Sequence, residues 1–303
     1  MARESQVFEL GHAGYPARLR DLGKPPPRLT VAGELAATGL RVAVVGTRKP
    51  SAEALSFTRE LARAIAERGG VVVSGGAVGI DAAAHEGAIL AGGATWVVAA
   101  TGPDEVFPRE NAGLFDRVAD GAGAMIWPFD PGRKAHPATF IARNGVLVAL
   151  ADVLVVVQAS APSGTLNAGG WARKLGRPVW AVCAPPWMPG FVGCASLIDR
   201  GARPLVSLSR WLTAVGFGPS SGGAARRVAG GAPALPGVLR AALDPGSRDL
   251  LSFLSATRPQ HIDEIAAKSG LSAQVGATAL LTLALEDVLV EGPEGQFRLA
   301  TSR

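Results

Sequence analysis

Three glycine-containing stretches follow runs of apolar residues and carry groups that can hold a phosphate. They are Gly46, Thr47 and Arg48 in VVGTRKPS, Ser74, Gly75 and Gly76 in SGGAVGIDAAAH, and Ser163 and Gly164 in QASAPSGTLNAGG. A helix that opens at such a turn directs free N–H groups and partial positive charge at an anion. Arg48 can hold a phosphate with two parallel hydrogen bonds. A single glycine turn is structural about as often as it binds a ligand, but three together indicate an anionic ligand.

Other chemistries find less support in the sequence. There is no G-x-x-x-x-G-K-[ST] stretch and no G-x-G-x-x-G opening the first helix. Asp81 and His85 share a helix face but form at most half a metal site. We expect them to be structural, with Asp81 binding loop N–H groups and His85 tying the helix to a neighbouring loop. Cys183 and Cys194 lack a second ligand pair, so we expect buried thiols, no metal and no cofactor.

The turns need a parallel sheet to position them. Unbroken apolar runs occupy residues 42–46, 71–75, 95–100, 124–128, 153–159 and 178–183. Segments long enough for helices lie between them at residues 52–68, 79–91, 138–150 and 165–175. Strands without polar alternation are buried on both faces, which requires helices on both sides. The pattern predicts a doubly wound, Rossmann-like α/β domain.

The chain divides into four predicted parts. Residues 1–40 form a Pro-interrupted lead-in, residues 41–206 the sheet domain, and residues 207–246 a flexible Gly-, Ala- and Pro-rich linker. Residues 247–303 show three helical segments and then VLVEGPEGQFRLA, which indicates two strands around a turn. Three helices and a hairpin are the outline of a small winged-helix domain.

Charge and hydropathy limit the partners. The net charge of the 303 residues is +5, but residues 247–303 hold five Lys and Arg against seven Asp and Glu. A mild basic excess permits a polyanionic partner without requiring one. No apolar run reaches the roughly 18 to 20 residues that span a bilayer. The first twenty residues lack the continuous apolar stretch of a secretory signal peptide. We expect a cytoplasmic protein without membrane contact.

Five motifs in order resemble the DNA-processing protein A family, also called Smf. They are VAVVGTR, SGGAVGIDAAAH, FIARNGVLVALADVLVVVQA, SGTLNA and GCASLIDRGARPL, and the similarity covers residues 15 to about 206. The resemblance implies a non-enzymatic homodimer that binds single-stranded DNA and loads a RecA-type recombinase, in DNA-mediated transformation (competence) or related recombination. Many members have a further helical N-terminal domain, which this chain is expected to lack.

The resemblance also implies which residues touch DNA. It assigns contact to Arg48, to the region of Lys134, Phe140 and Asn144, and to Ser163 and Gly164; Arg143 adds a cation. Arg48 and Lys134 suit phosphates, and Phe140 offers a face for a base. Phe140 as a buried helix anchor is the alternative. Trp127 and Trp171 are expected in the core.

Three positions depart from the family pattern. Val78 and Gly145 stand where arginines are usual, and Gln158 where a glutamate is usual. The absence of two cations would weaken binding and flatten its salt dependence by up to about one unit each. Arg133 beside Lys134 offers compensation. We therefore expect a weaker or specialised binder.

The C-terminal domain is expected to contact protein rather than DNA. Its third predicted helix, SAQVGATALLTLALE, has no Lys or Arg, and the wing carries Glu291 and Glu294. A helix without cations is poorly suited to a DNA groove, because phosphate attraction supplies most non-specific affinity.

Two other functions remain open. Related Rossmann-like folds sense nucleotides or hydrolyse them, and the hydrolases share P-G-G-x-G-T-x-x-E, where this chain reads APSGTLNAG without the glutamate. The second alternative is a paralogue that no longer binds DNA and keeps only protein contacts. It is motivated by Val78 and Gly145, which stand where the family usually has cations.

Overall fold

The computed structural model divides into two compact units, residues 1–222 and residues 223–303. The structure describes residues 5–35, 38–160, 163–185 and 187–217 of the first unit. Of the second it describes residues 254, 258, 260–261, 264–265, 289–291 and 296–299.

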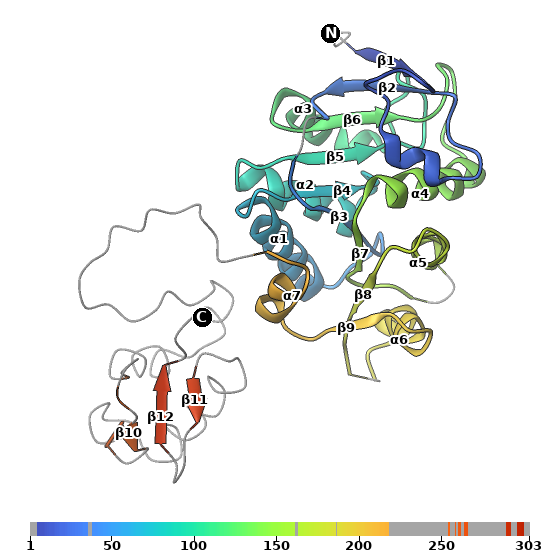
Figure 1. Cartoon of the computed structure of the whole chain (residues 1–303). Coiled ribbons are helices and arrows are strands. Elements are labelled where there is room, and N and C mark those ends of the chain that lie inside the picture. Colours follow the sequence, from blue (N-terminus) through green and yellow to red (C-terminus); the bar gives the residue numbers. More distant parts are fainter. Residues whose placement is uncertain are drawn as a thin grey trace. The chain divides into compact units, whose positions relative to one another are not determined.

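The first unit is built on one nine-stranded sheet (Figure 1). Its strands are β1 (Gln6–Glu9), β2 (Arg28–Gly33), β3 (Arg41–Val45), β4 (Val71–Ser74), β5 (Thr95–Val98), β6 (Ala124–Trp127), β7 (Val153–Val156), β8 (Val179–Val182) and β9 (Arg203–Leu205). They lie in the order β1-β2-β6-β5-β4-β3-β7-β8-β9. Strands β3 to β9 run parallel, and β1 and β2 are antiparallel to their neighbours. The six predicted apolar runs are confirmed as β3 to β8, whereas β1, β2 and β9 are additional.

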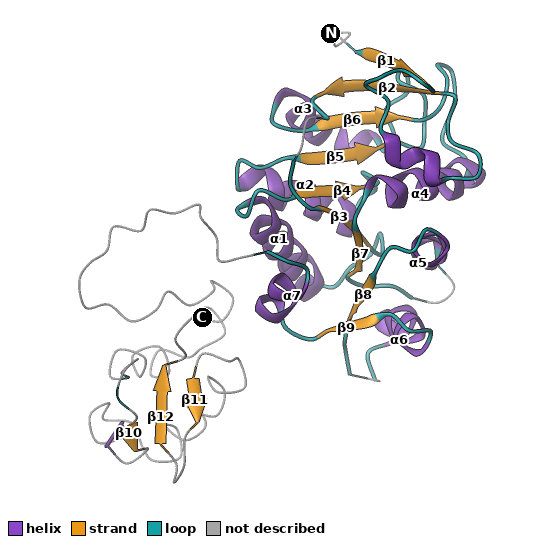
Figure 2. Ribbon diagram, viewed as in Figure 1, coloured by secondary structure: helices purple, strands orange, loops and turns teal. Residues whose placement is uncertain are grey.

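Helices cover both faces of the sheet, which confirms the doubly wound, Rossmann-like class (Figure 2). They are α1 (Ala52–Ala66), α2 (Ile80–Leu90), α3 (Ala112–Asp120), α4 (Pro137–Leu150), α5 (Gly164–Lys174), α6 (Val192–Asp199) and α7 (Leu208–Ala214). Short 3-10 turns are η1 (Ala17–Asp21), η2 (Arg109–Asn111) and η3 (Pro189–Phe191). The four predicted helices are confirmed as α1, α2, α4 and α5. One apolar core joins the sheet to η1, α4, α5 and α6, and the opposite face packs on α1, α2, α3 and α7.

Residues of the N-terminal lead-in pack against the sheet domain. Strand β2 pairs with β6, and Leu19 of η1 is fully buried in the core. Arg18 donates to Ala151 O at 3.0 Å and forms an ion pair with Asp152, which also accepts a hydrogen bond from Arg41 N at 2.8 Å. These bonds hold the lead-in to the starts of β3 and β7.

Helix α7 lies inside the stretch whose composition suggested a linker from residue 207 onward. Trp211 and Leu212 are buried against the α1 face, and Phe217 joins the same cluster. The Gly- and Ala-rich residues that follow dominate the composition of residues 207–246. This short apolar helix was therefore not recognised from the sequence. Residues 218–246 of the predicted linker lie outside the described residues.

The described part of the second unit is a small antiparallel sheet. Its strands β10 (Gln260–His261), β11 (Leu289–Glu291) and β12 (Gln296–Leu299) lie in the order β10-β12-β11. The predicted C-terminal hairpin is therefore confirmed as β11 and β12. The three predicted helices lie outside the described residues, apart from Leu254, His261, Glu264 and Ile265. Across everything the structure describes, no helix combines the length and apolarity needed to span a bilayer.

Candidate functional site

The three glycine turns meet at one edge of the sheet. The chain passes from β3 to β4 on one side and later returns to β7 on the other, so β3 is the strand at which the order reverses. Open α/β sheets bind ligands outside the carboxyl ends of strands at such a switch point. The turns follow β3, β4 and β7, which are three adjacent strands. The three turns therefore lie on the same side of the sheet.

Hydrogen bonds join the turn after β3 to its two neighbours. Thr47 N donates to Gln158 O at 2.8 Å, and Thr165 Oγ1 donates to Gly46 O at 3.2 Å. On the other side, Ile80 N donates to Thr47 O at 3.2 Å. The three turns thus form one connected surface rather than three separate loops.

Gln158 has a structural role at this edge. Its side-chain Oε1 accepts a hydrogen bond from Ser51 N at 3.0 Å, and it is almost fully buried. Ser51 in turn caps α1 by accepting from Ala54 N at 3.2 Å. The amide therefore supports the start of α1, and its neutral side chain places no negative charge near the turns.

The turn after β4 requires glycine for two reasons. Gly76 and Gly79 have φ values of +70° and +88°, in the left-handed region that favours glycine. A Cβ on Gly79 would also lie 2.6 Å from Thr47 O. Asp81 holds this turn as expected, because its Oδ2 accepts from Ala77 N, although the bond is long at 3.4 Å. Burial raises the pKa of Asp81, and the nearby Arg143 opposes that rise.

Arg143 forms a positively charged floor beneath this turn. The side chain comes from α4 and is 5% exposed. Its guanidinium lies against Gly75, since a Cβ there would be 1.4 Å from Nη1 of Arg143. Burial lowers the pKa of Arg143, Asp81 raises it and Arg48 lowers it. Its Nε has no hydrogen-bond partner among the described residues.

His85 is a neutral, fully buried histidine. Thr95 Oγ1 donates its proton to Val72 O at 2.9 Å, so the 2.7 Å contact between His85 Nδ1 and Thr95 Oγ1 has the imidazole as donor. Burial, with a smaller effect of Arg143, lowers the pKa of His85 to about 3. The partner lies in strand β5, not in a loop as predicted. In the described ranges no group of three or more His, Cys, Asp or Glu residues could hold a metal.

Arg48 lies exposed at the tip of the first turn, beside an aromatic ring. Its Cζ is 4.8 Å from the ring centroid of Phe140, which is half-buried near the start of α4. The ring of Phe107, which sequence reasoning missed, packs against Phe140 at 5.7 Å. No carboxylate of the described chain forms an ion pair with Arg48 or with Lys134.

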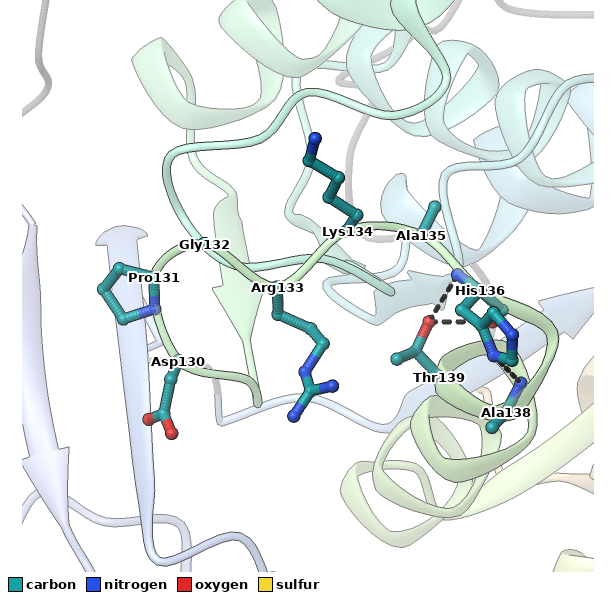
Figure 3. Close-up of a pocket in the computed structure, with 9 residues that line it drawn as sticks. All are labelled: Asp130, Pro131, Gly132, Arg133, Lys134, Ala135, His136, Ala138 and Thr139. Atoms are coloured by element: carbon teal, nitrogen blue, oxygen red, sulfur yellow. Dashed lines mark hydrogen bonds between the residues drawn. The ribbon is translucent and has the colours of Figure 1, made fainter.

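Lys134 lies in the loop between β6 and α4, which lines a pocket of about 570 Å³ (Figure 3). Lys134 and Arg133 extend to opposite sides of this loop in the close-up. Asp104, from the loop after β5, accepts from Gly132 N at 2.7 Å. His136 caps α4 by accepting from Ala138 N at 3.2 Å. The loop is therefore fixed at both ends.

Asn144 joins α4 to the turn after β7. Its Nδ2 donates to Gly164 O at 3.2 Å and to Asn167 Oδ1 at 3.3 Å. Ser163 Oγ is buried and has no hydrogen-bond partner within the described ranges. Gly164 is exposed where α5 opens. The amide of Asn144 is thus engaged in holding the third turn, whereas the hydroxyl of Ser163 is not used by any described residue.

Packing accounts for one of the departures from the family pattern. A Cβ on Gly145 would lie 3.0 Å from Cε2 of Trp171, so the indole occupies the space next to Gly145. Lys174 Nζ lies 4.9 Å from that indole ring. Trp171 and Trp127 are partly buried and pack against the apolar clusters, as predicted. Val78 is half-buried in the second turn, and nothing in the structure explains its identity.

The cysteine expectation is half correct. Cys194 is buried in the main core, where burial raises the pKa of its thiol to about 11. Cys183 is exposed just after β8, so the prediction that both thiols are buried is wrong. The apolar run that ends at Cys183 continues only to Val182 as a strand.

Comparison with known families gives two matches that together cover most of the chain. Residues 6–216 match the model of DNA recombination-mediator protein A, and residues 234–295 match the DprA winged helix domain. A putative DNA processing protein DprA of Mycobacterium tuberculosis is 35% identical over 294 residues, which cover 95% of this chain and 72% of the relative. DNA processing protein DprA of Bacillus subtilis is 34% identical over 195 residues, or 64% of this chain and 65% of the relative.

Solved structures show the same fold. DNA processing protein A from Streptococcus pneumoniae aligns with a TM-score of 0.65 and 30% identity, over 72% of this chain and 76% of that chain. The protein from Helicobacter pylori, described for its single-stranded DNA binding mode, aligns with a TM-score of 0.64 and 26% identity. That alignment covers 70% of this chain and 96% of the other.

Proposed function

This chain belongs to the DNA recombination-mediator protein A family, and on that premise we propose that its first unit binds single-stranded DNA across the carboxyl edge of β3, β4 and β7. The binding residues are the three glycine turns with Arg48, Arg143 and Ser163. Lys134 and Phe140 extend the site toward the loop after β6. A structural relative from H. pylori is described for its single-stranded DNA binding mode, which supports the proposal.

One observation carries the proposal: an exposed arginine, with no ion pair among the described residues, lies beside an aromatic ring at the switch point. Arg48 has no carboxylate partner in the described chain and lies 4.8 Å from the centroid of the Phe140 ring. Phe140 in turn packs against the ring of Phe107. A cation for phosphate beside an aromatic cluster on which an unpaired base can stack is the combination that single strands require. A duplex hides its base faces and would leave the cluster unused.

The buried Arg143 sets the strength of the site. It adds positive potential beneath Gly75, but 95% of its side chain is removed from solvent. Arg143 can therefore attract a phosphate at a distance but cannot reach out to contact it directly. With Trp171 packed next to Gly145, α4 provides no accessible cation at that position to supplement Arg143. We therefore propose moderate affinity with a shallow salt dependence.

We further propose that the bound strand is delivered to a RecA-type recombinase by a cytoplasmic homodimer. The process would be DNA-mediated transformation or a related recombination. Family membership supports these proposals. For the winged-helix domain we propose a protein-contact or regulatory role, because its third predicted helix carries no Lys or Arg.

The proposal is tested by fluorescence anisotropy with labelled single-stranded and duplex oligonucleotides over a salt series. The wild-type protein should prefer the single strand. Arg48→Ala and Lys134→Ala should weaken that binding and lower the salt slope by about 0.7 for each phosphate that is no longer neutralised. Arg63→Ala is the matched control, because Arg63 is exposed near the other end of α1 and pairs with Glu67.

Two results would overturn the site. One is equal affinity for single-stranded and duplex DNA. The other is an Arg63→Ala effect as large as that of Arg48→Ala, since general charge would then explain the binding. Recombinase delivery has its own assay, in which the protein should raise the DNA-dependent ATPase of a RecA-type recombinase on strands already coated by a single-stranded DNA-binding protein.

A hydrolytic function is not favoured by any contact at this edge. Helix α5, which begins at the third glycine turn, has no acidic residue among its first helical residues. Hydrolysis needs a positioned general base or acid. Asp81, the acidic residue in the turn after β4, is buried and engaged with Ala77 N. We therefore propose a non-enzymatic role, and nucleoside monophosphates should remain intact when incubated with the protein.

A further inference from the structure

An exposed apolar patch lies beside Arg48, and we propose that its outermost ring, Phe107, is the residue on which an unpaired base stacks. The patch, called the Phe107 patch below, consists of Val106, Phe107, Phe140 and Ile141. This inference rests on the proposed binding of single-stranded DNA and specifies where a base, as distinct from a phosphate, is held.

Exposure separates the two phenylalanines of the Phe107 patch. Phe107 is 43% exposed, whereas Phe140 is half-buried. Arg48 already lies over the Phe140 ring, and Phe107 packs against that ring at 5.7 Å with an angle of 58° between the planes. Phe140 is therefore engaged on two sides and serves as the support. The ring that still offers a surface to a ligand is Phe107.

The loop that carries Phe107 is fixed before any ligand arrives. Thr101 Oγ1 donates to Glu105 O at 2.9 Å, which closes the loop on itself. Asn111 Nδ2 donates to Gly76 O at 2.9 Å, which ties the loop to the turn after β4. Gly102 N donates to Arg133 O at 2.8 Å, which ties it to the loop after β6. A ring held in this way loses little conformational entropy on binding, which favours its use as a platform.

The charges around the Phe107 patch favour a nucleic-acid base over an apolar protein segment. Val106 and Ile141, which are direct neighbours of the two phenylalanines in the chain, are 49% and 52% exposed and add to the apolar surface. Arg48 beside it has no carboxylate partner among the described residues. A nucleotide of a single strand places a flat apolar base and an anionic phosphate within one unit's length, which matches this pairing.

The test compares two strands of equal charge: an oligothymidine and an oligonucleotide of the same length in which all sugars are abasic. Wild-type protein should bind the oligothymidine more tightly. Phe107→Ala and Phe107→Leu should weaken oligothymidine binding by about 5- to 150-fold, leave abasic binding and the salt slope unchanged, and so remove the preference. Phe107→Trp should keep it. Leu90→Ala is the control, because Leu90 is 76% exposed at the end of α2, away from the turns.

Each outcome decides between the hypotheses. If the wild type binds neither strand, the proposed function itself fails. If the wild type binds both strands and Phe107→Ala leaves their ratio unchanged, DNA binding stands and the stacking role of Phe107 is wrong. If Phe107→Ala weakens both strands equally, the ring only supports the loop, and the inference is again overturned. Thermal unfolding of each variant checks that the fold is intact, which the exposure of Phe107 predicts.

Discussion

Gly75 is the residue whose small size keeps Arg143 in place under the second turn. A Cβ at this position would lie 1.4 Å from Nη1 and 2.3 Å from Cζ of the guanidinium. Gly75→Ala must therefore displace a buried charged group. We expect a loss of about 1 to 3 kcal/mol in the free energy of unfolding, measured in urea, because overpacking a filled site costs that much. The affinity for single-stranded DNA should fall as well, because the guanidinium of Arg143 is displaced from beneath the second turn.

The matched control for this substitution is Gly170→Ala on α5. Gly170 is exposed inside the helix, and a Cβ there meets nothing within 4 Å. Alanine at this position should stabilise the protein by about 0.5 to 1 kcal/mol, because it has the better helix propensity. If Gly75→Ala were as harmless as Gly170→Ala, Arg143 would have room to move, and its proposed fixed position would be wrong.

His85 should make the stability depend on pH. Its pKa is about 3 in the folded protein, against 6.5 for the unperturbed residue. Between these values the unfolded chain binds a proton that the folded chain does not, so stability is lost as the pH falls below about 6.5. The slope reaches at most about 1.4 kcal/mol per pH unit.

The variant that isolates this effect is His85→Asn, which keeps a donor near Thr95 Oγ1 but does not titrate. Urea unfolding between pH 4 and 7 should show a flatter profile for His85→Asn than for the wild type. Asp81 acts in the opposite sense, because burial raises its pKa, and comparing the two proteins removes its contribution. An unchanged slope in the variant would mean that His85 becomes protonated in the folded state.

For single residues, the sequence predicted the positions of charged and small side chains well. It predicted poorly which residues contact one another in space. The glycines of the second turn and the arginine of the first lie at the expected edge, because strand ends and helix starts follow from local pattern. Phe107 was missed because its contact with Phe140 spans thirty-three residues and depends on two loops meeting. The covering of Gly145 by Trp171 is likewise a helix-to-helix contact that no local pattern contains.

The loops after β4, β5 and β6 act as one linked element. Asp104 in the middle loop accepts from Gly132 N through both carboxylate oxygens, each at 2.7 Å. Removing a carboxylate near bound DNA should by charge alone tighten binding. We expect Asp104→Ala to do the reverse and weaken single-strand affinity by about 2- to 10-fold, because breaking this hydrogen bond frees the loop that carries Lys134. Anisotropy titration measures the affinity.

Asp104→Asn separates charge from position. It keeps a side-chain oxygen that can accept from Gly132 N and removes the charge. Binding should be equal to that of the wild type or tighter. If both substitutions tighten binding, Asp104 acts only by repelling phosphate, and the linked-loop description fails.

Elements were predictable where burial made their pattern plain. Strands β3 to β8 are apolar runs buried on both faces, and α1, α2, α4 and α5 fill four of the five intervals between them. Helix α3 fills the fifth interval and was not predicted. Strand β1 was not recognisable, because its four residues are mostly exposed and gain their structure only by pairing with β2. Strand β9 contains a proline and is largely exposed, so its three residues also depend on a neighbour.

For the whole molecule, the distribution of charge between the two units decides where DNA is expected to bind. Residues 1–222 hold 22 Lys and Arg against 17 Asp and Glu, whereas residues 223–303 hold eight of each. The entire net charge of +5 therefore belongs to the first unit. A polyanion is attracted to the first unit, and a neutral surface is better suited to contact with another protein.

This distribution predicts that residues 1–222 alone account for the salt-dependent binding. The fragment ends where the compact first unit ends, and its core includes helix α7. Its salt slope with single-stranded oligonucleotides should equal that of the full chain, and its affinity should lie within about threefold, because every proposed phosphate-binding residue is retained. Residues 223–303 should bind neither single-stranded nor duplex DNA at low salt. A fragment slope lower by about 0.7 or more would mean that the second unit also binds a phosphate, and its protein-contact role would then have to include DNA.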